Sequence, residues 1–146
     1  MTALAWALAL TLWLIAAVHF YWGLGGLWPA RNATSLARAV VGARGITRMP
    51  AATACLTVAA VLVAIGSWPL YATAVLPAIS PSWFVYAAGT AIAAIFLARG
   101  VAPYLVIWRR RTPEQPFVSL DRWLYGPLCL ALGTGFAVLL LKGVYK

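Results

Sequence analysis

Three ionisable side chains lie within or at the edge of the chain's long apolar stretches and are the first candidates for chemistry. His19 is the only histidine in the 146 residues, and Asp121 is one of only two acids. Arg99 lies inside a third apolar stretch. A histidine and a carboxylate can act as general acid and base, and an arginine can hold an anion or pair with the carboxylate. His19 and Asp121 are therefore the candidate catalytic residues.

His19 shares one helical face with Trp22, Gly23 and Gly26, because these residues are three, four and seven positions further on. A functional histidine here would carry a proton, contact a ligand or bind a metal. A structural histidine would form a hydrogen bond to another helix, which the small residues would allow to approach. A single histidine cannot form a convincing metal or haem site. The sequence therefore predicts no metal site, and it identifies no cofactor.

Asp121 allows three interpretations. It could cap or precede a helix as a first-turn acid, since acids favour helix N-termini. It could form a structural ion pair with Arg99, whose burial would be compensated by bidentate geometry. It could also have a catalytic or ligand-binding role. Arg99 itself could instead extend its guanidinium to the headgroups, as long basic side chains do near helix ends.

The elements that must position these residues are four apolar stretches. Hydrophobic residues make up 64% of the chain and charged residues 9%, far from the roughly 45–50% and 25% of soluble domains. Each stretch approaches the length of about 20 residues that a spanning helix needs. The sequence predicts a single all-α domain, 1–146, built as a four-helix transmembrane bundle. The predicted spans are 4–24, 50–68, 82–108 and 124–141.

Glycine, proline and tryptophan mark the predicted helix ends. Trp28-Pro29 and Trp68-Pro69 both follow an apolar stretch, which is typical of a helix that stops. Between the first two spans, the residues 36–41 predict a short interfacial helix that Thr34 or Ser35 would cap and Gly42 would end.

The arginines predict an orientation. The first connection (29–49) and the third (109–123) carry four arginines each, and the second (69–81) carries none, whereas Lys142 and Lys146 lie near the C-terminus. Because cytoplasmic loops collect basic residues, both termini should lie outside the cytoplasm, in a bacterial inner membrane. The net charge of +9 is then explained by topology and by the lipid bilayer as partner, and nucleic acid is not expected.

Counting turns places all the unusual residues in the inner half of the predicted bundle. If they converge, they form a small polar cavity open toward the cytoplasm, with Trp22, Arg99 and Tyr125 as candidate ligand contacts. The set consists of His19, Trp22, Arg99, Asp121, Tyr125 and Cys129.

Two stretches resemble a bacterial family of small four-span membrane proteins of unknown function. The first is His19-Phe20-Tyr21-Trp22-Gly23-Leu24-Gly25-Gly26 with Trp28-Pro29. The second joins Phe117-Val118-Ser119-Leu120-Asp121-Arg122 to Tyr125-Gly126-Pro127-Leu128-Cys129-Leu130. The resemblance covers most of the chain. It implies that His19, Trp22, Asp121 and Pro127 matter, but it brings no activity, substrate or cofactor.

Three classes of function remain open. The first is a non-enzymatic accessory or structural protein, acting with another membrane protein or as a homo-oligomer. The second is an enzyme or binder for a lipid or hydrophobic small molecule that uses His19, Asp121 and Arg99. The third is a small oligomeric transporter. The sequence favours the first, because it lacks recognised catalytic motifs and carries no acid in the middle of a span. A lipid-sized cavity reaching His19 would favour the second.

Overall fold

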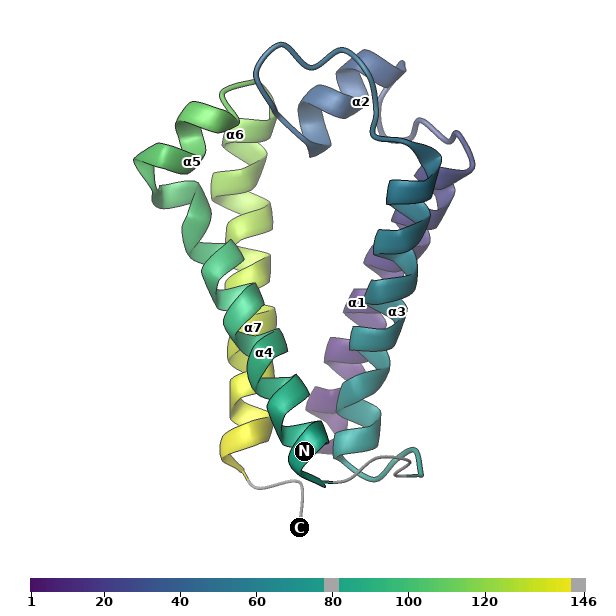
Figure 1. Cartoon of the computed structure of the whole chain (residues 1–146), viewed down its shortest axis with the longest axis vertical. Helices are drawn as coiled ribbons and strands as arrows, with labels where there is room; N and C mark the ends of the chain where they lie inside the picture. The colour runs from purple at the N-terminus through teal and green to yellow at the C-terminus, as the bar shows by residue number, and fades with distance from the viewer. Residues whose placement is uncertain (78–81, 143–146) are drawn as a thin grey trace.

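The computed structural model describes residues 1–77 and 82–142, and these fold entirely as helices and connecting loops (Figure 1). Four helical segments are long and apolar enough to cross a membrane: Thr2–Gly23, Ala52–Ala72, Ser82–Tyr104 and Phe117–Leu141. This confirms the prediction of an all-α protein with four membrane-length helices. The elements in chain order are α1 (Thr2–Gly23), α2 (Ala33–Val40), α3 (Ala52–Ala72), α4 (Ser82–Val101), η1 (Ala102–Tyr104), α5 (Val106–Arg111), α6 (Phe117–Leu120), η2 (Asp121–Tyr125) and α7 (Gly126–Leu141).

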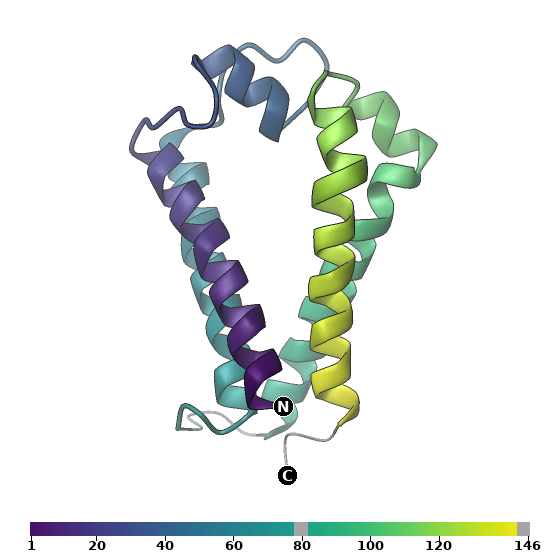
Figure 2. The same cartoon turned by 180° about the vertical axis from the view of Figure 1, so that it is seen from behind.

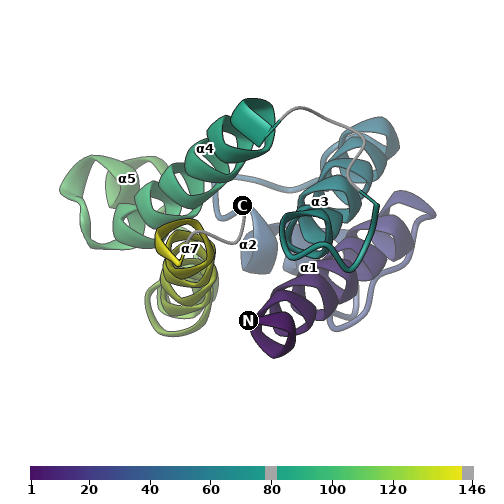
Figure 3. The same ribbon diagram turned by 90° about the horizontal axis from the view of Figure 1, so that it is seen from below.

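The long helices form two hairpins rather than an evenly packed bundle. Helix α1 packs along α3, and α4 packs along α7, as the view along the bundle shows (Figure 3). Small residues allow the second pair to approach closely: a Cβ added at Gly100 would lie 2.6 Å from the side chain of Leu130. The two hairpins diverge toward the end that carries α2 and α5 (Figure 2). We call this end the arginine-rich end, because both arginine-containing connections lie there.

An apolar core joins the hairpins in the half away from the arginine-rich end. Phe136 of α7 lies at its centre, with its ring 5.4 Å from that of Trp68 and 6.0 Å from that of Phe96. The indole N–H of Trp68 donates to the carbonyl of Val85 on α4 at 3.0 Å. This core therefore holds the hairpins together at one end, and they lie further apart at the other.

Helix α2 bridges the two hairpins at the arginine-rich end (Figure 1). It begins one turn earlier than the predicted 36–41, because Asn32 and not Thr34 or Ser35 is its N-cap. The Asn32 side chain accepts from the amide of Ser35 at 2.8 Å, and the Ser35 hydroxyl lies 3.3 Å from the amide of Asn32. This reciprocal pair is a capping box. Gly42, with φ at +65°, follows the end of the helix, as predicted.

The second span differs from its predicted end at residue 68. Helix α3 continues to Ala72, with Pro69 inside it and fully buried. An internal proline costs a helix about 3 kcal/mol. Packing offsets that cost here, since Trp68 and Leu70 are both buried against neighbouring helices. The prediction that Trp68-Pro69 marks the end of a helix is therefore wrong, because the helix continues through both residues.

The third and fourth spans also have different boundaries. The predicted helix 82–108 ends at Tyr104, because Leu105 is extended and the chain turns into the separate helix α5. Pro103 lies in η1, where the helix tightens before it breaks. The fourth segment begins at Phe117 and not near 124. The polar Asp121 and Arg122 do not end this segment, since the Asp121 side chain is buried and paired with a cation.

Candidate functional site

A cavity of about 530 Å³ lies between the diverging hairpins. Both hairpins and α2 contribute to its wall, so it depends on the assembly of the whole chain. Its lining consists of Ile15, Val18, His19, Trp22, Val40, Val58, Leu62, Phe96, Arg99, Leu124, Tyr125, Leu128, Cys129 and Leu132.

The polarity of the cavity changes along its length. The polar side chains His19, Arg99 and Tyr125 line it nearer the arginine-rich end. Leu132 and Phe96 lie further along their helices, on the side of the apolar core. Leu124 and Leu132 are eight positions apart, which corresponds to a depth of about 12 Å at about 1.5 Å per residue. The cavity is therefore an apolar space with a polar mouth.

His19 presents one free ring nitrogen. Its Nδ1 lies 2.8 Å from the carbonyl oxygen of Ile15 in the same helix. Because a carbonyl can only accept, Nδ1 must carry the proton, and Nε2 of the neutral ring is then an acceptor. Among the described residues, Nε2 has no hydrogen-bond partner. The hydrogen bond predicted for a structural histidine is thus present, but within α1 and not between helices.

Trp22 fixes the position of the His19 ring. The two rings meet edge to face with centroids 5.1 Å apart. The Trp22 indole N–H in turn donates to the carbonyl of Trp28 at 2.8 Å, which ties the end of α1 to the following loop. His19 and Trp22 also line a second, smaller cavity of about 170 Å³ on the side of Cys55 and Met49. The His19 ring therefore lies in the wall between two hollows.

Arg99, Asp121 and Trp108 form a compact cluster behind the cavity. Arg99 Nη2 donates to Asp121 Oδ1 at 2.6 Å, and Trp108 Nε1 donates to Asp121 Oδ2 at 2.8 Å. The guanidinium of Arg99 also lies over the Trp108 ring, 5.1 Å from its centroid. The Asp121 side chain is only 3% exposed and makes no helix-cap hydrogen bond. Of the three interpretations of Asp121, the geometry supports the ion pair and not the cap.

Arg99 is the member of this cluster that reaches the cavity. Its side chain is 31% exposed and forms part of the cavity wall. Its other terminal nitrogen, Nη1, is buried and has no hydrogen-bond partner among the described residues. An unpaired buried donor is costly, so the cluster leaves one polar group of Arg99 unsatisfied.

The structure brings together most of the residues singled out from the sequence. His19, Trp22, Arg99, Tyr125 and Cys129 line one cavity. Asp121 does not line it, because Arg99 and Trp108 occupy both of its carboxylate oxygens. No hydrogen bond joins His19 to Asp121 within the described residues. Across residues 1–77 and 82–142, no three histidine, cysteine or acidic side chains gather as metal ligands.

Two contacts that sequence reasoning missed join the second hairpin to α2 and to the loop that follows α2. The Tyr125 hydroxyl donates to the carbonyl of Ala39 at 3.2 Å, which places Val40 in the cavity wall. Glu114, in the third connection, accepts from the amide of Gly45 at 2.9 Å and lies 3.7 Å from Arg38. The signal was present in the sequence, since Glu114 is the only other acid and lies in a connection with four arginines.

The comparisons with known proteins agree with this fold. The family model for a protein of unknown function, DUF3995, matches residues 12–136. The chain belongs to the DUF3995 family. The matched range contains every residue that lines the 530 Å³ cavity, and it confirms the resemblance to an uncharacterised family of small four-span proteins. No curated protein and no solved structure matches the chain.

Proposed function

We propose that this DUF3995 protein binds a lipid or another hydrophobic small molecule between its two hairpins, without catalysing a reaction. The observation that carries the proposal is the 530 Å³ cavity, which reaches His19 and is lined by both hairpins. Its volume lies within the roughly 300–1,000 Å³ of small-molecule sites, which are mostly apolar and carry a few polar groups for orientation.

The arrangement of the lining suits an amphiphile. An apolar chain would pack between Phe96 and Leu132 and would pass the polar mouth at His19 and Arg99, with the polar group of the ligand toward the arginine-rich end. His19 Nε2 could accept a hydrogen bond from a ligand hydroxyl, and the partly exposed guanidinium of Arg99 could donate one. The gain from burying an apolar chain is about 0.8 kcal/mol for each CH₂ group.

The geometry favours binding over catalysis. A general base must lie within hydrogen-bond reach of the proton that it removes, directly or through one water. Both oxygens of Asp121 are already bonded, and the carboxylate is not part of the cavity wall. His19 is hydrogen-bonded to its own helix and not to a carboxylate. An acid–base pair of His19 and Asp121 therefore has little support.

An accessory role and a transport role remain predictions with less support. An accessory protein needs no internal cavity, so that role leaves the main feature of the fold unexplained. A transporter would need a polar path between the two ends of the bundle. The described residues around Phe136, Trp68 and Leu12 are instead apolar and buried in the half beyond the cavity.

The protein is further proposed to cross a bacterial inner membrane with its arginine-rich end in the cytoplasm and both termini outside. The eight arginines of connections one and three support this orientation, since basic loops stay in the cytoplasm. A reporter fused after Lys146 tests it. Reporter activity outside the cytoplasm is expected, and activity inside would reverse the orientation.

The binding proposal is tested by native mass spectrometry of the protein released from lipid nanodiscs. The wild type should retain one or more small molecules. Val58→Trp, at a residue that lines the cavity, should reduce the retained amount by filling the space. Val61→Trp is the matched control, because Val61 lies on the same helix, is similarly exposed and does not line the cavity. Equal retention in all three proteins would contradict the proposal.

A further inference from the structure

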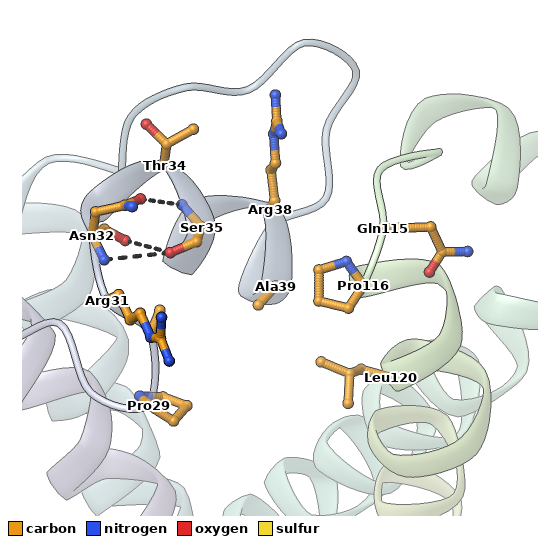
Figure 4. Close-up of a pocket in the computed structure, with 11 residues that line it drawn as sticks. Pro29, Arg31, Asn32, Thr34, Ser35, Arg38, Ala39, Gln115, Pro116 and Leu120 are labelled. Atoms are coloured by element: carbon orange, nitrogen blue, oxygen red, sulfur yellow. Dashed lines mark hydrogen bonds between the residues drawn. The ribbon is translucent and has the colours of Figure 1, made fainter.

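A third hollow, of about 800 Å³, lies at the arginine-rich end beside α2 (Figure 4). Pro29 and Arg31 lie on one side of it, Pro116 and Leu120 on the other, and Ala39 at the end of α2. The loop after α1 and the start of the fourth helical segment therefore face each other across this space. The binding site proposed above does not include this hollow.

This hollow adjoins the cavity between the hairpins. Leu120 lines the hollow and Leu124 lines the cavity, and these residues are one helical turn apart on the same helical segment. On α2, the neighbouring residues Ala39 and Val40 contribute to the hollow and the cavity respectively. A molecule with a polar head and a long apolar tail could therefore occupy both spaces at once.

The charge of the hollow is positive. Arg31 is exposed and forms no ion pair with the described residues. Arg38 also lines the hollow, but its Nε lies 3.7 Å from a carboxylate oxygen of Glu114, with which it forms an ion pair. Arg31 is thus the available cation. The only two acids of the chain are each already paired, Glu114 with Arg38 and Asp121 with Arg99.

We infer that the ligand is a phospholipid with a negatively charged headgroup. Its phosphate binds in the hollow beside Arg31, and its acyl chain enters the cavity past Leu120 and Leu124. The inference rests on the proposed function, which it extends by naming the ligand class. Charge complementarity carries it, because an arginine matches a phosphate in both charge and geometry. Basic hollows between membrane helices are also suited to anionic headgroups.

The test uses nanodiscs that contain equal amounts of phosphatidylglycerol and phosphatidylethanolamine with identical acyl chains. Native mass spectrometry then measures how much of each lipid stays with the protein. The wild type should favour phosphatidylglycerol, and Arg31→Gln should lower the ratio about fivefold, which corresponds to about 1 kcal/mol for one basic residue near an anionic headgroup. Arg31→Lys should keep most of the preference. Arg48→Gln is the matched control, since Arg48 is exposed in the same connection but does not line the hollow.

The outcomes separate the two proposals. If Val58→Trp reduces both lipids while Arg31→Gln leaves the ratio unchanged, the cavity binds lipid but the headgroup inference is wrong. If Val58→Trp leaves the retained amounts of both lipids unchanged, the proposed binding in the cavity is itself wrong. A further arm adds millimolar inorganic phosphate to the wild type. Loss of phosphatidylglycerol in that arm, with no effect on phosphatidylethanolamine, would indicate a site for free phosphate and would overturn the lipid assignment.

Discussion

Arg99 of α4 and Asp121 of η2 form a hydrogen-bonded ion pair, with Nη2 and Oδ1 2.6 Å apart. The pair links the two helices of the second hairpin at the depth of the cavity. Trp108, beyond the end of the third helical segment, completes it by donating to the second carboxylate oxygen. One buried carboxylate therefore holds three separate parts of the chain in place, and Arg99 extends from this cluster into the cavity wall.

Removing the carboxylate should destabilise the protein. Asp121→Ala leaves Arg99 without its partner, and breaking a buried pair typically costs about 3–5 kcal/mol. Because Arg99 is 31% exposed, we expect a loss near the lower end of that range. Asp121→Asn should lose less, since an amide oxygen can still accept from one donor. Unfolding followed in detergent measures both losses, with Ser119→Ala, at an exposed residue of the same segment, as control. A loss no larger than that of the control would contradict a structural ion pair.

The Tyr125 hydroxyl should hold α2 over the cavity. Tyr125→Phe removes the hydrogen bond to the Ala39 carbonyl and keeps the ring, so we expect a loss of about 0.5–1.5 kcal/mol and faster amide exchange in residues 33–40. Tyr104→Phe is the matched control, because the Tyr104 hydroxyl donates to the Arg122 carbonyl and does not contact α2. Hydrogen–deuterium exchange separates the two variants. Equal exchange of α2 in both would show that Tyr125 does not anchor it.

Glu114 should act mainly through its hydrogen bond to the Gly45 amide. Glu114→Gln removes the charge, and the exposed pair with Arg38 should contribute only about 0–1 kcal/mol. The glutamine oxygen can still accept from Gly45. Glu114→Ala removes both contacts and should accelerate exchange of the Gly45 amide. If the glutamine variant exchanges there as fast as the alanine variant, the charge and not the acceptor is what holds the two connections together.

The sequence predicted more of the fold than of the candidate site. Uninterrupted apolar stretches indicate helices by length alone, and both arginine-rich connections lie at one end as expected. The helix ends were less predictable. Pro69 is tolerated because Trp68 packs into the core, and the fourth segment extends back to Phe117 because Arg99 neutralises Asp121. Such effects depend on contacts between residues far apart in the chain.

The sequence predicted how far along the helices the candidate residues lie, but not the direction in which their side chains point around each helix axis. Counting turns placed His19, Arg99 and Tyr125 in the inner half of the bundle, and all three line the same cavity. The same counting could not reveal that Asp121 lies behind Arg99, or that Val40 of α2 forms part of the wall. Those facts depend on how the two hairpins rotate and separate, and a linear pattern of residues carries little information about either.

The central claim is that the ligand lies between the hairpins, and the most direct test is photo-crosslinking with a phosphatidylglycerol that carries a diazirine in its acyl chain. The protein is loaded in nanodiscs, purified in mild detergent to remove loosely bound lipid, and then irradiated. Peptide sequencing by mass spectrometry should find labels on cavity residues such as Leu62, Phe96 and Leu132. Labels confined to outward-facing residues such as Leu14 and Ile95, which are 69% and 65% exposed, would contradict the account.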